Sequence, residues 1–172
     1  MAAIEIAKFI REKSRSENND FTLMLSDARC LPLSPDQFDI VFMLDIVEHL
    51  SPKDLDQTLK QVHRVLKPSG RLIIHTMPNM NYYKYGYPVY RALMKVLGKH
   101  LPEDPRDRFY HGEVHVNIQS PRSLRRYLHE AGFDRVDVRL TQLSGSLFKK
   151  ALCRLFPLKY VLANDILASA RK

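Results

Sequence analysis

Apolar residues follow two alternating spacings along the chain, one typical of strands and one typical of helices. Short apolar runs bounded by turn residues predict strands at 21–25, 38–44, 71–76 and 133–140. Apolar residues at helical spacing predict one helix between Ser51 and Leu66 and another between Ser120 and Ala131. Each helix starts at a Ser-Pro pair and is followed by a glycine, which are typical start and stop signals. Strands that alternate with helices in this way indicate an α/β fold built on a parallel sheet.

Polar residues follow two of the predicted strands at the point where each ends. The pair Asp27-Ala28 follows the strand at 21–25, and an acidic cluster from Asp45 to His49 follows the strand at 38–44. The 38–44 run is nearly all apolar, so we expect a central strand covered on both faces and not an edge strand. Open α/β sheets bind ligands where their strands end, so this spacing predicts a nucleotide-type ligand across the two strand ends.

Composition favours a single domain in the cytoplasm. The 172 residues suit one domain over 1–172, and the apolar fraction of 45% is ordinary. Asp39 and Asp45 interrupt the longest apolar stretch, so no membrane span is predicted. Glu5 and Lys8 likewise interrupt the N-terminal apolar residues, where a secretory signal needs an unbroken apolar block.

The formal net charge of +8 permits an acidic partner without requiring one. The basic residues are spread along the chain and are not interleaved with aromatic residues, so we do not expect nucleic-acid binding. Cys30 and Cys153 lack the spacing of metal ligands, which predicts ordinary thiols and no disulfide.

Two segments fall outside the strand-helix repeat. Residues 78–117 are rich in tyrosine and interrupted by prolines, and we interpret them as an insertion on the substrate side of the domain. The tyrosines there could stack on a planar acceptor or cover the sheet edge. Residues 143–160 combine an apolar stripe with Lys149, Lys150 and Arg154, which predicts a basic amphipathic helix. Such a helix either packs on the sheet or contacts an anionic membrane through 145–156.

Several short motifs, in order over most of the chain, resemble the class I S-adenosylmethionine-dependent methyltransferases. Within that family the chain is similar to the group that methylates small molecules, including the ubiquinone and menaquinone biosynthesis enzymes. The motifs are Asp27-Ala28 with Leu31-Pro32-Leu33, Phe38-Asp39-Ile40-Val41, Glu48-His49-Leu50, Leu66-Lys67-Pro68-Ser69-Gly70-Arg71-Leu72, and Ser123-Leu124 with Ala131-Gly132-Phe133. A set of motifs in order is far more specific than any one of them.

The resemblance implies a Rossmann-like sheet with helices on both faces, and a site that holds S-adenosylmethionine. Asp27 would accept a hydrogen bond from the adenine amino group, the Ala28 amide would meet the ring, and Leu44 and Asp45 would also contact the cofactor. An alternative for Asp27 is that its carboxylate caps a turn. Glu48, His49 and His115 would face the acceptor as the catalytic residues.

The cluster of Asp45, Glu48 and His49 leaves three roles open. In similar quinone-methylating enzymes such a cluster holds a divalent metal or orients the acceptor hydroxyl, but Asp45 stands where those enzymes carry Glu, and we assign no metal ligand from the sequence. Oxygen-rich ligands of this kind would suit magnesium better than zinc. Glu48-His49 can instead act as a general acid/base pair, or His49 can satisfy backbone groups. His111 and His115 have ligand spacing only in a helix, which Gly112 disfavours.

The family's glycine-rich cofactor loop has no counterpart among the residues of this chain. All six glycines follow the Asp27-Ala28 motif, so we expect an N-terminally truncated domain without the first two strands. In the family's strand order, 3-2-1-4-5-7-6, those two strands separate the strand at 21–25 from the strand at 38–44. Either these two strands then pair directly, or a partner chain, a second copy or upstream sequence covers the exposed sheet edge. The segment 165–170 resembles the family's last strand, which inserts antiparallel.

The functional prediction is S-adenosylmethionine-dependent methyl transfer to a small-molecule acceptor, impaired where the glycine-rich loop is missing. The enzyme class comes from the resemblance and not from the composition. The alternative is a non-catalytic, methyltransferase-like remnant that acts as a protein-interaction module through its sheet edge.

Overall fold

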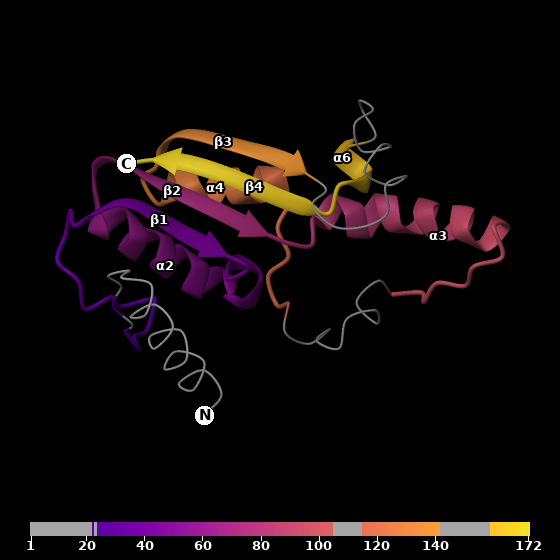
Figure 1. Cartoon of the computed structure of the whole chain (residues 1–172), viewed down its shortest axis with the longest axis horizontal. Helices are drawn as coiled ribbons and strands as arrows, with labels where there is room; N and C mark the ends of the chain where they lie inside the picture. The colour runs from indigo at the N-terminus through magenta and orange to yellow at the C-terminus, as the bar shows by residue number, and fades with distance from the viewer. Residues whose placement is uncertain (1–21, 23, 105–114, 142–158) are drawn as a thin grey trace, which may run out of the picture.

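A computed structural model describes residues 22, 24–104, 115–141 and 159–172 of the chain (Figure 1). In this part, four strands form one sheet in the order β1-β2-β4-β3. Strands β1 (Phe38–Leu44) and β2 (Leu66–Thr76) are parallel, whereas β4 (Asp165–Arg171) is antiparallel to both β2 and β3 (Asp134–Thr141). The predicted α/β class is confirmed, and this order matches the 4-5-7-6 half of the order that the resemblance implied.

The two predicted helices begin and end where the local signals place them. Helix α2 (Pro52–Val65) has Ser51 as its N-cap, and the Ser51 hydroxyl accepts a hydrogen bond from the Asp54 amide. Helix α4 (Pro121–Glu130) has Ser120 as its N-cap within a reciprocal capping box with Ser123. Both helices carry proline in the first turn, where the missing N–H costs nothing. Strand β2 begins at Leu66, directly after α2, and therefore earlier than the 71–76 run predicted.

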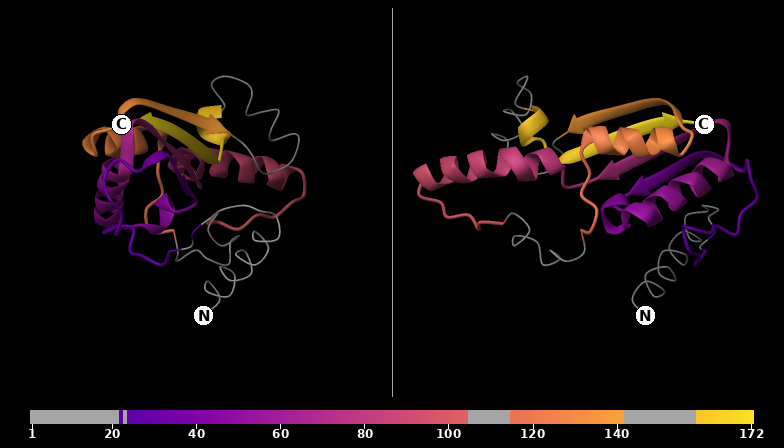
Figure 2. Two further views of the ribbon diagram at one scale, coloured as in Figure 1. Left: turned by 60° about the vertical axis from the view of Figure 1, so that its left-hand side comes forward. Right: turned by 180° about the vertical axis from the view of Figure 1, so that it is seen from behind.

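Helices α2 and α4 lie on the same face of the sheet (Figure 2). Their apolar residues and the alternate residues of the strands form the buried core, which includes Leu55, Leu59, Leu124, Leu128, Leu72, Ile74 and Ile166. Each of these seven side chains is fully buried. Burial of this kind, at about 25 cal/mol per Å² of apolar surface, is what stabilises the two-layer arrangement.

The remaining described elements lie at the end of the sheet where β1 and β2 finish (Figure 1). The short helix η1 (Val47–His49) follows β1, and η2 (Tyr82–Gly86) leads into α3 (Tyr87–Val96), with α6 (Lys159–Leu162) beside η2. The segment 78–117 is therefore partly helical. Among the described residues, no helix has both the length and the apolar character needed to cross a bilayer.

Two predictions about the strands are wrong. The described residues of the 21–25 segment, which are 22, 24 and 25, are not in a strand and do not pair with β1, and Leu25 is 91% exposed. Strand β1 is an edge strand of the described sheet, with Phe42 58% and Leu44 55% exposed. An apolar run shows that the side chains of a strand favour burial on both faces of the sheet. They are buried only where other strands or helices cover them. In the described part of the chain, β1 has one neighbouring strand, β2.

Some predictions concern residues outside the described part of the chain. These are the amphipathic helix with its membrane contact at 145–156, Cys153 and His111. Cys30 is described and is an exposed free thiol.

Candidate functional site

Helix η1 directs Glu48 into the protein directly after the end of β1. The Glu48 side chain is 1% exposed, and its carboxylate accepts a hydrogen bond from the Thr76 hydroxyl at 2.7 Å. Thr76 is the last residue of β2, so this bond joins the carboxyl ends of the two parallel strands. The neighbouring His49 is exposed. A buried acid and an exposed imidazole therefore stand side by side where an α/β sheet binds ligands.

His115 reaches the same place from a segment distant in the sequence. The Asn117 amide donates a hydrogen bond to the Glu48 carbonyl at 3.1 Å, and the Met80 amide donates to the carbonyl of buried Gln119 at 2.8 Å. These bonds fix the backbone of residues 117–119 beside η1. The His115 ring centre then lies 5.0 Å from that of His49, with the planes tilted by 50°.

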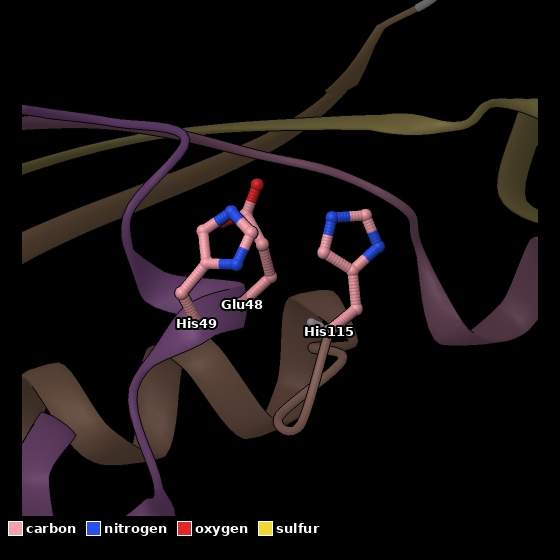
Figure 3. Close-up of side chains that lie close together, drawn as sticks. All are labelled: Glu48, His49 and His115. Carbon is pink, nitrogen blue, oxygen red and sulfur yellow. The ribbon is translucent and has the colours of Figure 1, made fainter. Parts of the chain in front are cut away.

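Glu48, His49 and His115 form a compact cluster (Figure 3). One ligand-type atom from each of the three side chains lies within 4.8 Å of the other two. These are the three residues that the sequence nominated as catalytic, and the fold brings all of them together. Their arrangement can accept a proton, orient a hydroxyl or hold a cation.

Asp45 is not part of this cluster and pairs with His75 instead. Its backbone is left-handed, with φ of 53°, and its carboxylate lies 2.7 Å from Nδ1 of His75. The other ring nitrogen of His75, Nε2, lies 3.7 Å from the carboxylate of Asp165, which is buried. The triplet of Asp45, His75 and Asp165 joins the ends of β1, β2 and β4.

Sequence reasoning missed His75, Thr76 and Asp165. A signal for two of them was present, because His75 and Thr76 end the predicted strand at 71–76, next to the strand that precedes Asp45. Asp165 could not be found in this way, since its contact depends on β4 pairing with β2.

Asp27 caps a turn in the described structure. Its carboxylate accepts hydrogen bonds from the Arg29 amide at 2.9 Å and from the Arg29 guanidinium at 2.7 Å. The same guanidinium reaches the Asp54 carboxylate at 2.9 Å, at the start of α2. The hydrogen bonds from Arg29 lower the pKa of Asp27 to about 2. Arg29 thus occupies the carboxylate that the resemblance assigns to adenine, and a bound adenine would share it or displace Arg29.

Removing Arg29 is expected to raise the pKa of Asp27 from about 2 toward its ordinary value of 3.8. Because the folded pKa is depressed, the pair contributes stability above pH of about 4, and this stability is lost as the pH falls through about 2. The Arg29→Ala variant should therefore lose less stability on acidification. Carbon-13 NMR titration of the Asp27 carboxyl measures the pKa, with Lys60→Ala, which removes the partner of Asp56, as the control. An unchanged Asp27 pKa in Arg29→Ala would contradict the assignment.

The remaining predicted positions differ in accessibility. Leu44 ends β1 with its side chain 55% exposed, so a ligand can pack on it, and Ala28 is half-buried in the turn that Asp27 caps. Among the tyrosines, Tyr82 and Tyr87 are buried and their rings meet edge to face, whereas Tyr85 is 52% exposed.

Residues 2–74 match the methyltransferase domain family. The chain is 30% identical over 128 residues to the ubiquinone/menaquinone biosynthesis C-methyltransferase UbiE of Pseudomonas aeruginosa, covering 73% of this chain and 48% of that protein. It is also 30% identical over 140 residues to the mitochondrial 2-methoxy-6-polyprenyl-1,4-benzoquinol methylase of Bos taurus, covering 77% of this chain and 41% of that protein. The chain thus spans about half the length of the curated relatives it matches.

Solved structures show the same fold at lower sequence identity. A SAM-dependent methyltransferase from Archaeoglobus fulgidus superposes with a TM-score of 0.59 at 21% identity, over 89% of this chain and 68% of that one. A phosphoethanolamine N-methyltransferase from Haemonchus contortus, solved in complex with S-adenosyl-L-methionine, gives 0.55 at 16% identity, over 85% of this chain and 36% of that one. The fold predicted from the motifs is therefore confirmed.

Proposed function

Because the chain belongs to the class I S-adenosylmethionine-dependent methyltransferases, we propose that it forms the adenine and acceptor side of a methyl-transfer site for a small molecule. The observation that carries this proposal is the meeting of Glu48, His49 and His115 at the carboxyl ends of β1 and β2. The carboxyl ends of strands are where open α/β sheets bind their ligands.

The cofactor contacts in this proposal come from the turn at Asp27 and from the end of β1. Asp27 and the Ala28 amide hold the adenine, and the exposed Leu44 packs against the adenosine. Asp45, which His75 holds at 2.7 Å, lies directly beyond Leu44 and contributes a fixed negative charge. S-adenosylmethionine carries a positive sulfonium, so a carboxylate in this position favours binding.

Glu48, His49 and His115 take the catalytic roles in this proposal. The methyl carbon leaves the sulfonium sulfur as the acceptor atom forms its new bond, and the proton of the acceptor passes to an imidazole nitrogen of His49 or His115. Glu48 is buried beside them and is held by Thr76, so it acts as a positioning residue. Correct placement of acceptor and methyl group supplies much of the rate acceleration.

A quinol ring is the acceptor class to test first. The curated relatives at 30% identity act in ubiquinone and menaquinone biosynthesis or methylate a benzoquinol, according to their names. The exposed ring of Tyr85, on η2, offers a face on which a planar ring of this kind can stack.

Binding of S-adenosylhomocysteine, the product that the cofactor leaves, tests the proposed cofactor contacts. Isothermal titration calorimetry with S-adenosylhomocysteine should give saturable binding that weakens about 10- to 100-fold in Asp27→Ala, which loses a charged hydrogen bond. Asp56→Ala removes a half-buried carboxylate on α2 and serves as the control. Transfer of labelled methyl groups to reduced quinols tests the proposed acceptor. In the calorimetry, absence of heat at millimolar S-adenosylhomocysteine would contradict the proposal for this chain.

A second candidate function is a protein-interaction module, favoured by the exposed apolar side chains of β1. Ile40, Phe42 and Leu44 are 49%, 58% and 55% exposed on a strand that has one neighbour within the described residues. Such an edge can add a strand from a partner chain or a second copy. Sedimentation velocity distinguishes the two candidate functions. If the edge strand β1 binds a partner chain or a second copy, Phe42→Lys should abolish that association.

A further inference from the structure

We propose that Glu48, His49 and His115 bind a divalent transition-metal ion of the zinc class. The three residues offer two imidazole nitrogens and one carboxylate oxygen, and these atoms lie within 4.8 Å of one another. Zinc sites of this composition, with two histidines and one glutamate, leave a further position for water or substrate. The proposal concerns the ion alone and does not require methyl transfer.

The separation of the ligand atoms suits one ion after small side-chain rotations. Ligand atoms lie about 2.0–2.2 Å from zinc in a tetrahedral arrangement, so two ligands of one ion are about 3.3–3.6 Å apart. The candidate ligand atoms lie within 4.8 Å of one another. They have to approach by at most about 1.5 Å to reach the tetrahedral separation, and rotation about the side-chain bonds of exposed His49 can bring them closer. The backbone needs no movement, because Asn117 already ties the segment after His115 to Glu48.

The identity of the ligands sets the class of ion. The sequence motif groups Asp45 with Glu48 and His49, a set rich in oxygen that would favour magnesium. In the structure His75 holds the Asp45 carboxylate at 2.7 Å, and His115 takes the third place in the cluster. Replacing a carboxylate by an imidazole shifts the preference from magnesium toward zinc, cobalt, iron or nickel.

The surroundings of Glu48 are those of a metal ligand. Its side chain is 1% exposed, and within the described residues no lysine or arginine forms an ion pair with it. A charged carboxylate at a buried position is stabilised by a compensating positive charge, which a divalent ion would supply. Thr76 donates its hydroxyl hydrogen to one carboxylate oxygen, which fixes the group and leaves the second oxygen to coordinate.

An ion at this point would change how the site handles its acceptor, a consequence that rests on the proposed function. The imidazoles would then serve as ligands and not as proton acceptors. An acceptor hydroxyl in the open position would lose its proton more easily, because a bound divalent ion lowers the pKa of a coordinated oxygen.

Cobalt(II) absorption spectroscopy on the tag-free chain tests the site without any turnover. We expect visible bands that saturate with one equivalent of Co²⁺ and disappear when Zn²⁺ is added. His115→Ala and Glu48→Gln should each weaken binding by about 100-fold or more, since even outer-shell changes cost 10- to 100-fold. His129→Ala, which removes an exposed histidine in the last turn of α4, should bind as the parent does. Circular dichroism confirms that each variant is folded.

The Asp45→Asn variant distinguishes between two possible sets of metal ligands. One set is the cluster in the structure, Glu48, His49 and His115, and the other is the sequence motif, Asp45, Glu48 and His49. Because Asp45 pairs with His75 and is not part of the cluster, this variant should retain Co²⁺ binding. Loss of binding in Asp45→Asn equal to that in His115→Ala would overturn the proposed ligand set. Absence of Co²⁺ binding at millimolar metal, or binding that His115→Ala leaves intact, would overturn the site itself. Binding of S-adenosylhomocysteine is measured separately, so failure of the metal site and failure of the proposed function are distinguishable.

Discussion

Replacing Leu59 by alanine is expected to lower the free energy of unfolding by about 2–5 kcal/mol. Leu59 lies on α2 with its side chain fully buried in the core that α2 and α4 form with the sheet. The substitution removes apolar contacts and leaves a cavity that the neighbouring strands cannot fill without shifting. Domains of this size are stable by about 5–15 kcal/mol, so the loss is a large share of the total.

Urea denaturation followed by circular dichroism measures this change. Leu97→Ala is the matched control, since it makes the same chemical change at a side chain that is 62% exposed at the end of α3. Its free energy of unfolding should change by about 0.5 kcal/mol or less, as is usual at the surface. Equal effects of the two substitutions would show that α2 does not pack on the sheet as described.

Replacing His115 by alanine is expected to slow methyl transfer by about 10²- to 10⁴-fold, the usual contribution of a positioned proton-transfer group. His115 stands against His49 and Glu48 in the cluster that faces the acceptor in our proposal. The affinity for S-adenosylhomocysteine should stay unchanged, because the proposed adenine contacts come from Asp27 and Ala28. The rate is measured with labelled S-adenosylmethionine and a reduced quinol, with His129→Ala as the control.

Free imidazole should restore part of the His115→Ala rate, since it can enter the space left by the ring. The dependence of that rate on pH and on added Zn²⁺ separates a proton acceptor from a metal ligand. A His115→Ala enzyme with parental turnover would remove His115 from the reaction while leaving the fold and the cofactor proposal standing.

Helix boundaries could be read from the sequence because their causes are local. Ser51 and Ser120 cap the helices with hydrogen bonds to residues three positions further on. Gly132 takes a φ of +95° after α4, a conformation that glycine adopts without strain. Each of these signals involves residues within one turn of each other, so no tertiary information is needed.

Strand environment could not be read in the same way. The apolar runs at 38–44 and 21–25 predicted two strands, the first of them central, yet Leu44 and Leu25 are exposed. A strand is completed by hydrogen bonds to a neighbour that can lie anywhere in the chain or in another chain. The composition of a strand shows only whether its side chains favour burial. Whether they are buried depends on the strands and helices that pack against it.

The sequence by itself determined the family, the helix ends, the α/β class and the nomination of Glu48, His49 and His115. Motif order and short-range hydrogen bonding carry that information. Only the tertiary structure decided that His115 joins Glu48, because that meeting depends on Asn117 bonding to the Glu48 backbone. It also decided that Asp45 turns to His75, since those two residues meet through the pairing of β1 with β2. Contacts between distant segments arise from packing, which no local pattern records.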